Sequence, residues 1–159
     1  AGLLSPIGLA GQAHSAEIIH SITVNVAAPL ALSNRFLAIT GQCIDRRIIH
    51  VSSGAARSPY AGWNVYCASK AALDHHARCV SMEGPEHCRI ESIAPGVIDT
   101  QMQATIRASA LEQFPMRPRF DQLKESGSLA SPEEVARKLI QHLLSQSFGV
   151  SPCTDLRDL

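Results

Sequence analysis

The chain has 159 residues, of which 45% are hydrophobic, and 14 basic residues balance 14 acidic ones. This length suits one domain with a real core and is too short for two. The basic residues are scattered, so we expect no nucleic-acid partner and no anionic membrane surface. No run approaches the roughly 18 apolar residues of a membrane span, and the opening AGLLSPIGLAG lacks the basic start of a signal peptide. The composition therefore predicts a single soluble domain over residues 1–159, without a membrane partner.

The five cysteines form no C-x-x-C pair and are odd in number. Neither a disulfide framework nor a cysteine-based zinc site is indicated by this pattern. His75 and His76 are neighbours in a predicted helix, so their side chains diverge and do not favour a shared metal. We therefore expect no metal site and a reducing, cytoplasmic compartment.

The first half of the chain predicts a helix, a strand and a second helix. Apolar residues recur at three-to-four spacing over 13–37, and Pro29 in this segment favours a kink or break near Ala28. The run RRIIHVSSG at 46–54 is typical of a strand that ends in a loop. From Asn64 to about residue 82 the sequence is Ala-rich without Gly or Pro, which predicts a helix.

The second half begins with RIESIAPG at 89–96, a strand that Pro-Gly ends. Residues 99–129 have weak periodicity, so we expect an irregular or part-helical excursion. Ser131, followed by proline and two glutamates, marks the start of a helix that runs to about Ser145. Residues 150–157 predict a short edge strand. Because strands and helices alternate at lengths that suit parallel crossovers, the sequence predicts an α/β fold with a layered parallel sheet.

Tyr66 and Lys70 lie four residues apart on the predicted helix, so their side chains share a face. A phenol has a pKa near 10, and a neighbouring ammonium favours the phenolate and lowers that pKa. Tyrosine then becomes a usable general acid. The alternative is that the spacing arises by accident.

Ser53 precedes Tyr66 by thirteen residues and stands at the carboxyl end of a predicted strand, where parallel sheets place ligand chemistry. Its hydroxyl would hold and polarise a carbonyl oxygen that Tyr66 protonates. Ordinary capping of the strand end is the alternative for this serine. The loop PGVIDT at 95–100 follows the next strand and offers backbone donors and the Thr100 hydroxyl, unless it is a simple turn.

Three segments resemble the short-chain dehydrogenase/reductase family in their order and spacing: VSSG (51–54), YCASKAAL (66–73) and APGVIDT (94–100). The resemblance extends over essentially the whole chain. It implies the C-terminal part of a doubly wound, Rossmann-like parallel sheet that binds a nucleotide, and it implies an oxidoreductase.

The resemblance also implies roles for single residues. Ser53 would position the carbonyl, Tyr66 would be the acid/base, and Lys70 would lower the tyrosine pKa and hold the cofactor ribose. Asn25, in VNVAAP, matches the asparagine of a water-linked proton relay, although stabilisation of a helix kink is the alternative. The loop that holds the nicotinamide would comprise Pro95, Gly96, Val97 and Thr100.

Within the family, GWNVYCASKAA (62–72), DTQMQ (99–103) and LKESGSLASPEEVA (123–136) look closest to the sepiapterin reductase and benzil reductase branch. That resemblance implies the reduction of a small carbonyl compound, a ketone or diketone, by NADPH in preference to NAD. It also implies a homodimer or homotetramer, with the helices around 13–37 and 64–82 at the interface.

Three further residues concern the substrate of such a carbonyl reductase. Asp155 is similar to the aspartate that anchors the pterin in sepiapterin reductases, although members that do not use pterins also carry one. Trp63 and Tyr60 would line the substrate pocket, or else serve plain packing. The 99–129 excursion would be the substrate lid.

The G-x-x-x-G-x-G phosphate loop of the family is missing from the sequence. Ala1-Gly2 resembles the tail of the family's N-N-A-G motif, which implies that about three β-α units of roughly 30 residues are absent. Without the phosphate loop we expect no tight cofactor binding by this chain alone. Two accounts compete: a fragment of a full reductase, or a truncated, non-catalytic dimerisation module. Retention of the four matching residues favours the first, as does the unpaired strand edge that truncation would expose.

Overall fold

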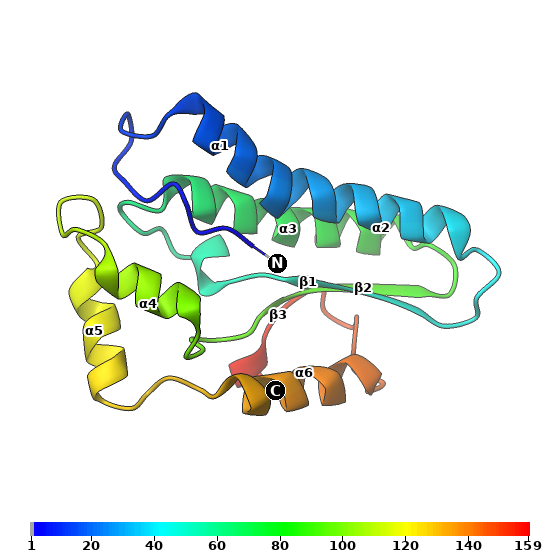
Figure 1. The fold of residues 1–159 in the computed structure, drawn as a ribbon. Helices are drawn as coiled ribbons and strands as arrows, with labels where there is room; N and C mark the ends of the chain where they lie inside the picture. The colour runs from blue at the N-terminus through cyan, green and yellow to red at the C-terminus, as the bar shows by residue number, and fades with distance from the viewer. Residues whose placement is uncertain (1) are drawn as a thin grey trace.

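A computed structural model describes residues 2–159 and shows a three-stranded parallel sheet with helices on both faces (Figure 1). The strands are β1 (Arg46–Val51), β2 (Cys88–Ala94) and β3 (Cys153–Asp155), in the spatial order β1-β2-β3. All neighbours pair in parallel. The α/β class predicted from the alternation of elements is confirmed.

Strand β2 is the centre of the sheet, and every residue from Ile90 to Ala94 is buried. Such a continuously buried run is typical of a parallel strand with both faces covered. β3 is the short edge strand that the sequence predicts, and Pro152 immediately precedes it. β1 forms the opposite edge and ends at Val51, so the loops after β1 and β2 leave the sheet at the same end.

Helices surround the sheet in two layers and one projecting pair (Figure 1). One face is covered by α1 (Ser15–Ile22), α2 (Ala28–Ile39) and α3 (Asn64–Glu83), and the other face by α6 (Pro132–Leu144). The remaining helices, α4 (Gln101–Ala108) and α5 (Arg117–Glu125), lie beyond the carboxyl ends of the strands. The 99–129 segment is therefore part-helical, as predicted. At the start of α6, Ser131 accepts a hydrogen bond of 3.2 Å from the Glu134 N–H, which confirms the predicted cap.

The irregularity that the sequence predicts near Ala28 is present in the first long helix, directly before that residue. Residues Thr23–Ala27 form a π-helical turn, in which the Ala28 N–H donates to the Thr23 carbonyl five residues back. Pro29 has no N–H, so it cannot donate to the carbonyl of Asn25, four residues back. The helix accommodates the proline by widening around Asn25 instead of breaking at Ala28.

Counted together, α1, the π-turn and α2 span Ser15–Ile39, which is long and apolar enough to cross a membrane by length and composition. The expectation that no segment reaches this threshold is therefore wrong for the folded helix. The observation is weak evidence for a membrane, because a helix that packs in a water-soluble protein passes the same test. The buried residues of this helix are the polar Ser21, Asn25 and Ser33, and the helix lies along α3 (Figure 1).

Two apolar clusters bind the helices to the sheet. Between the sheet and α3 lie Ile48, Ala77, Val80 and Ile90. Between the sheet and α6 lie Ile93, Val135, Phe148 and Leu156. Burial of each large aliphatic or aromatic side chain contributes about 1.5–3 kcal/mol, so these clusters fix the sheet that carries the loops after β1 and β2.

A histidine pair also lies between β1 and α3, in which His50 is buried and His76 is half-buried. His50 is 5% exposed, and its Nε2 lies 3.0 Å from Nδ1 of His76. Burial, together with the nearby charges of His76 and Lys70, lowers the pKa of His50 to about 4, while Asp74 acts in the opposite direction. The folded protein therefore holds His50 neutral at pH values where an unfolded chain protonates its histidines.

This pair predicts a specific loss of stability in acid. Between the unfolded pKa of 6.5 and the folded pKa of about 4, the unfolded chain binds a proton that the folded chain does not, so stability falls as the pH falls. From pH 7 to pH 5 we expect this effect to remove about 2 kcal/mol from the free energy of unfolding, and His50→Leu to abolish it. Urea unfolding of the complete protein at both pH values measures the difference.

His75→Leu is the matched control for that measurement, because His75 is exposed and lies next to His76 on α3. It should leave the pH dependence as it is in the wild type. If His50→Leu and the wild type lose the same free energy between pH 7 and pH 5, the assignment of the acid sensitivity to His50 is wrong.

Candidate active site

A cavity of about 570 Å³ opens where the loops after β1 and β2 leave the sheet. Residues from the loop after β1, from α3, from the loop after β2 and from α4 and α5 line it. Nine of the eleven residues that the sequence predicts for the site are among them: Ser53, Tyr60, Trp63, Tyr66, Lys70, Pro95, Gly96, Val97 and Thr100. Asn25 and Asp155 are not.

Tyr66 and Lys70 lie on one face of α3, as their spacing predicts, and both are buried. The Lys70 ammonium lies 5.6 Å from the centroid of the Tyr66 ring. It donates a hydrogen bond of 2.8 Å to the carbonyl of Val51, the last residue of β1. The lysine therefore ties α3 to the end of the strand and keeps its charge beside the phenol.

The protonation of the pair depends mainly on burial. Burial raises the pKa of Tyr66 above its ordinary value, and a hydrogen bond with Ser53 opposes this effect. Burial lowers the pKa of Lys70, and the charge of Asp74 opposes this effect. The predicted lowering of the tyrosine pKa by lysine is thus not the dominant effect in this structure. Tyr66 is a protonated phenol at neutral pH, which is the form that can donate a proton.

Ser53 has two uses in the structure. It caps the short 3₁₀ turn Gly54–Ala56, where its Oγ accepts a hydrogen bond of 3.1 Å from the Ala55 N–H. The same side chain lies close enough to the Tyr66 phenol to lower its pKa, and it lines the cavity. Capping and a place in the site, which the sequence leaves as alternatives, therefore coexist.

Asn25 lies behind the cavity and fastens the beginning of the chain. Its Oδ1 accepts from the Leu3 N–H at 2.7 Å, and its Nδ2 donates to the Leu3 carbonyl at 2.7 Å. Gly2 is next to this anchor, and a Cβ there would lie 3.6 Å from Asn25 Oδ1 and 3.7 Å from Lys70 Nζ. Asn25 and Lys70 therefore border the same small space beside Gly2, which lines the cavity.

The loop after β2 carries a left-handed residue, Gly96, with φ of 83°. Only glycine adopts this conformation without strain. Thr100 precedes the first residue of α4, and Asp99 accepts a hydrogen bond of 2.7 Å from Lys124 on α5. The loop and the projecting helices are thus joined at one side of the cavity.

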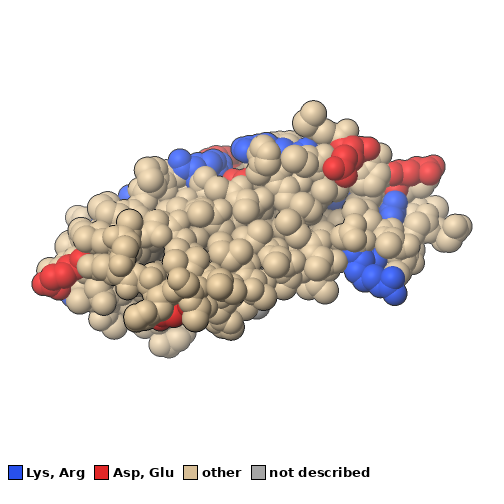
Figure 2. Space-filling model, turned by 90° about the horizontal axis from the view of Figure 1, so that it is seen from above, with Lys and Arg blue, Asp and Glu red and all other residues tan. Residues whose placement is uncertain are grey.

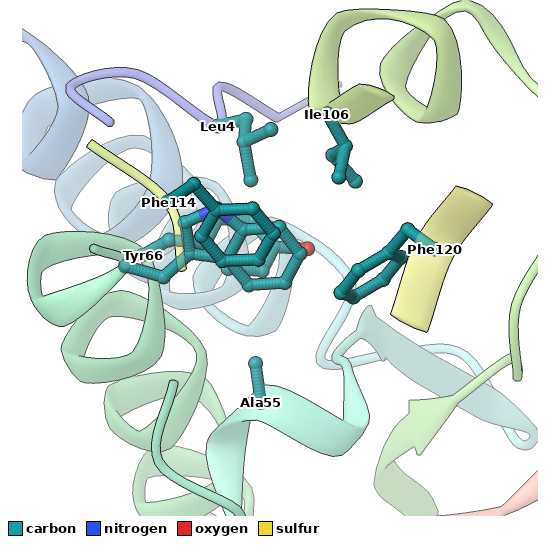
Figure 3. Close-up of a cluster of buried hydrophobic side chains, with 7 residues drawn as sticks. Leu4, Ala55, Tyr66, Ile106, Phe114 and Phe120 are labelled. Carbon is teal, nitrogen blue, oxygen red and sulfur yellow. The ribbon is translucent and has the colours of Figure 1, made fainter. Parts of the chain in front are cut away.

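An apolar wall surrounds the Tyr66 ring. Figure 3 shows Leu4, Ala55, Ile106, Phe114 and Phe120 around it. Trp63 belongs to the same cluster and stacks on Phe114, with ring centroids 4.4 Å apart. Three of these side chains, Ile106, Phe114 and Phe120, come from the 99–129 segment. This segment therefore supplies much of the apolar surface near the phenol.

Asp74 also belongs to the site region, although the sequence pattern does not predict it. It lies one turn after Lys70 on α3 and is 2% exposed. Its Oδ1 accepts hydrogen bonds from Ser52 at 2.5 Å and from Ser92 at 2.8 Å. A buried carboxylate thus joins α3 to the ends of both β1 and β2. The four-residue spacing between Lys70 and Asp74 is the sequence signal that would place Asp74 on the same face of the helix.

Asp155 is separated from the cavity by Arg157. The guanidinium donates to the carboxylate through Nε at 2.8 Å and through Nη2 at 2.6 Å. These bonds lower the pKa of Asp155 below its ordinary range. Arg157 lines the cavity and Asp155 does not, so the predicted substrate residue is the partner of the lining residue. In the sequence, the only sign of this ion pair is the two-residue spacing of the opposite charges.

The described residues fit one end of the nicotinamide cofactor that the sequence resemblance implies. Lys70 and Tyr66 could hold a ribose, and the loop Pro95–Val97 presents backbone beside a glycine without a side chain. These groups line one continuous cavity. The sequence contains no G-x-x-x-G-x-G segment for the phosphates, so the fit covers the nicotinamide end alone.

Comparison with known proteins agrees with this geometry. The model of the short chain dehydrogenase family matches residues 1–111. The benzil reductase ((S)-benzoin forming) of Bacillus cereus is 40% identical over 152 residues, which cover 93% of this chain and 61% of that protein. The sepiapterin reductase of Rattus norvegicus is 30% identical over 148 residues, which cover 91% of this chain and 55% of that protein. The chain thus spans about three fifths of the length of these relatives.

Solved structures share the fold. The crystal structure of the KRED1-Pglu enzyme superposes with a TM-score of 0.84 at 30% identity, over 94% of this chain and 63% of that chain. The angucycline C-6 ketoreductase LanV with bound NADP superposes with a TM-score of 0.75 at 28% identity, over 98% of this chain and 58% of that chain. Sequence, fold and the arrangement around Tyr66 agree: the chain belongs to the short chain dehydrogenase family.

Proposed function

We propose that the complete protein reduces one carbonyl group of a small dicarbonyl compound to an alcohol, with NADPH as the hydride donor. The observation that carries this proposal is the gathering of Ser53, Tyr66, Lys70 and the Pro95–Val97 loop around one cavity. The names of the relatives, benzil reductase and sepiapterin reductase, support the carbonyl substrate. The NADP bound to LanV supports the choice of NADPH over NAD.

In this proposal Ser53 and Tyr66 hold the carbonyl oxygen by hydrogen bonds. Bound NADPH supplies the hydride that the carbonyl carbon accepts. Tyr66 gives its phenolic proton to the oxygen, and the ammonium of Lys70 stabilises the phenolate that remains until a proton returns. We assign Asn25 to the path of that returning proton, since Asn25 and Lys70 border the same space beside Gly2.

The apolar wall gives the proposed substrate its shape. Trp63 and Phe120 present aromatic surface beside Tyr66, which suits the phenyl groups of an aryl diketone. We assign the 99–129 segment the role of a substrate lid, because it contributes Ile106, Phe114 and Phe120 to this wall. Exclusion of water by the wall strengthens the hydrogen bonds to the carbonyl oxygen.

Tight binding of NADPH, in this proposal, requires the part of the family fold that carries the phosphate loop. The described residues would hold only the nicotinamide end. The complete site around Tyr66 supports an enzyme over a non-catalytic dimerisation module, because a pairing module needs no phenol and ammonium in one cavity. We keep the cytoplasmic compartment as part of the proposal, with five free cysteines in its favour.

We also propose a homodimer, or a homotetramer that contains it, built on the outer face of α1, α2 and α3. Figure 2 shows this face with few charged side chains, most of them near its edges. Exposed apolar side chains lie on it: Ile19 is 65% exposed, Leu32 70% and Met82 89%. Contact with a second copy would remove this apolar surface from water.

Replacement of Tyr66 by phenylalanine tests the reaction. In the complete protein, Tyr66→Phe should lower NADPH-dependent turnover of benzil by a factor on the order of 10² to 10⁴, because the proton donor is lost. The ring still packs against Trp63, so the Kd for NADPH and the unfolding midpoint should hardly change. Turnover within a few-fold of the wild type would refute the assignment of the proton donor.

A charge on the outer helical face tests the assembly. Leu32→Arg should lower the molar mass of the assembly that the complete protein forms, because an arginine there must be desolvated at the interface. Light scattering after size exclusion measures this mass. Ile140→Arg is the matched control, since Ile140 is 55% exposed on α6 at the opposite face of the sheet. An unchanged mass in Leu32→Arg would show that this face is not the interface.

A further inference from the structure

The charged side chains that line the cavity among the described residues all carry the same sign. They are Lys70, Arg119 and Arg157, and no aspartate or glutamate of the described chain lines it. Lys70 is committed to the Val51 carbonyl beside the phenol. Arg119 lies over the Tyr60 ring, with its guanidinium carbon 5.8 Å from the centroid. Arg157 is already paired with Asp155 at 2.6 Å, so what it brings to the cavity is its remaining N–H donors.

Arg157 is held in one orientation. Its backbone N–H donates to Asp155 Oδ1 at 3.0 Å, in addition to the two guanidinium bonds of 2.8 and 2.6 Å. Its aliphatic part lies against Gly96, where a Cβ would come within 3.3 Å of Arg157 Cδ. A side chain that is already fixed loses little conformational entropy when it binds a ligand.

The pairing decides which hydrogen bonds the cavity offers. A guanidinium has five N–H donors, and two of them point at Asp155, so three remain. Both oxygens of Asp155 accept bonds from Arg157, and the residue is 7% exposed. At this place the cavity therefore offers the N–H donors of an arginine whose charge Asp155 balances. Without the arginine it would offer the acceptors of a carboxylate.

We infer that Arg157 determines specificity: it selects carbonyl compounds that carry a carboxylate or a second carbonyl beyond the reacting group, and it disfavours compounds that end in amino or amidine donors. This inference rests on the proposed function and names the substrate class of the same site. An acceptor bonds to the three remaining N–H groups, whereas a donor finds no acceptor on this side chain. The Arg157 side chain is 64% exposed, so this preference rests on the direction of the hydrogen bonds and not on desolvation.

Three probes of the complete protein with NADPH test the inference. Phenylglyoxylate carries a carboxylate next to its ketone, benzil carries a neutral second carbonyl, and sepiapterin ends in amino and amide donors. In Arg157→Leu, kcat/KM for phenylglyoxylate should fall by about 10- to 100-fold, the cost of lost hydrogen bonds to a charged group. Benzil should lose less, and sepiapterin should gain because Asp155 becomes available.

Two further variants separate specificity from folding. Arg157→Lys keeps the charge but loses the fork that bonds Asp155, so it should lower the phenylglyoxylate-to-benzil ratio by less than Arg157→Leu does. It also tests the inference if the leucine variant does not fold. Arg137→Leu removes the same charge from an exposed position on α6 and should leave the ratio unchanged.

The results separate a failure of the role of Arg157 from a failure of the proposed function. If the wild type reduces benzil and both Arg157 variants keep its ratio of kcat/KM values among the probes, the role of Arg157 is overturned while the proposed function stands. If the wild type reduces none of the three compounds with NADPH, the proposed function is overturned and the role of Arg157 with it.

Discussion

The arrangement around the cavity depends on one buried carboxylate. Asp74 accepts hydrogen bonds from Ser52 at the end of β1 and from Ser92 in β2, and so fixes α3 across the ends of two strands. Hydrogen bonds to a charged group contribute about 1.5–3 kcal/mol each, and a buried carboxylate without them would cost several kcal/mol. With α3 held there, Lys70 reaches the Val51 carbonyl and Tyr66 faces Ser53.

The two ends of the cavity divide the chemistry of the proposed reduction. Near Tyr66, apolar and aromatic side chains raise the pKa of the phenol and keep its proton in place until a carbonyl oxygen accepts it. Near Gly96, the guanidinium of Arg157, which Asp155 holds in place, offers N–H donors. A substrate with an aromatic group and a second acceptor satisfies both ends at once.

The sequence predicts those parts of the molecule that local physics determines. The strands, α3 and the start of α6 follow from residue pattern and capping, and the family resemblance places Ser53, Tyr66 and Lys70 together. Features that depend on contacts between distant segments cannot be predicted from the sequence pattern. The stacking of Trp63 on Phe114 joins α3 to a segment of weak periodicity, and the raised pKa of Tyr66 depends on the burial that follows.

A crystal structure of the complete protein with NADP and (S)-benzoin would test the central claim most directly. The account predicts the benzoin hydroxyl within about 2.6–3.2 Å of both Tyr66 Oη and Ser53 Oγ, with the nicotinamide against the Pro95–Val97 loop. A phenyl group should lie on the wall formed by Trp63 and Phe120. Benzoin bound away from Tyr66, or a nicotinamide that does not reach this loop, would contradict the account.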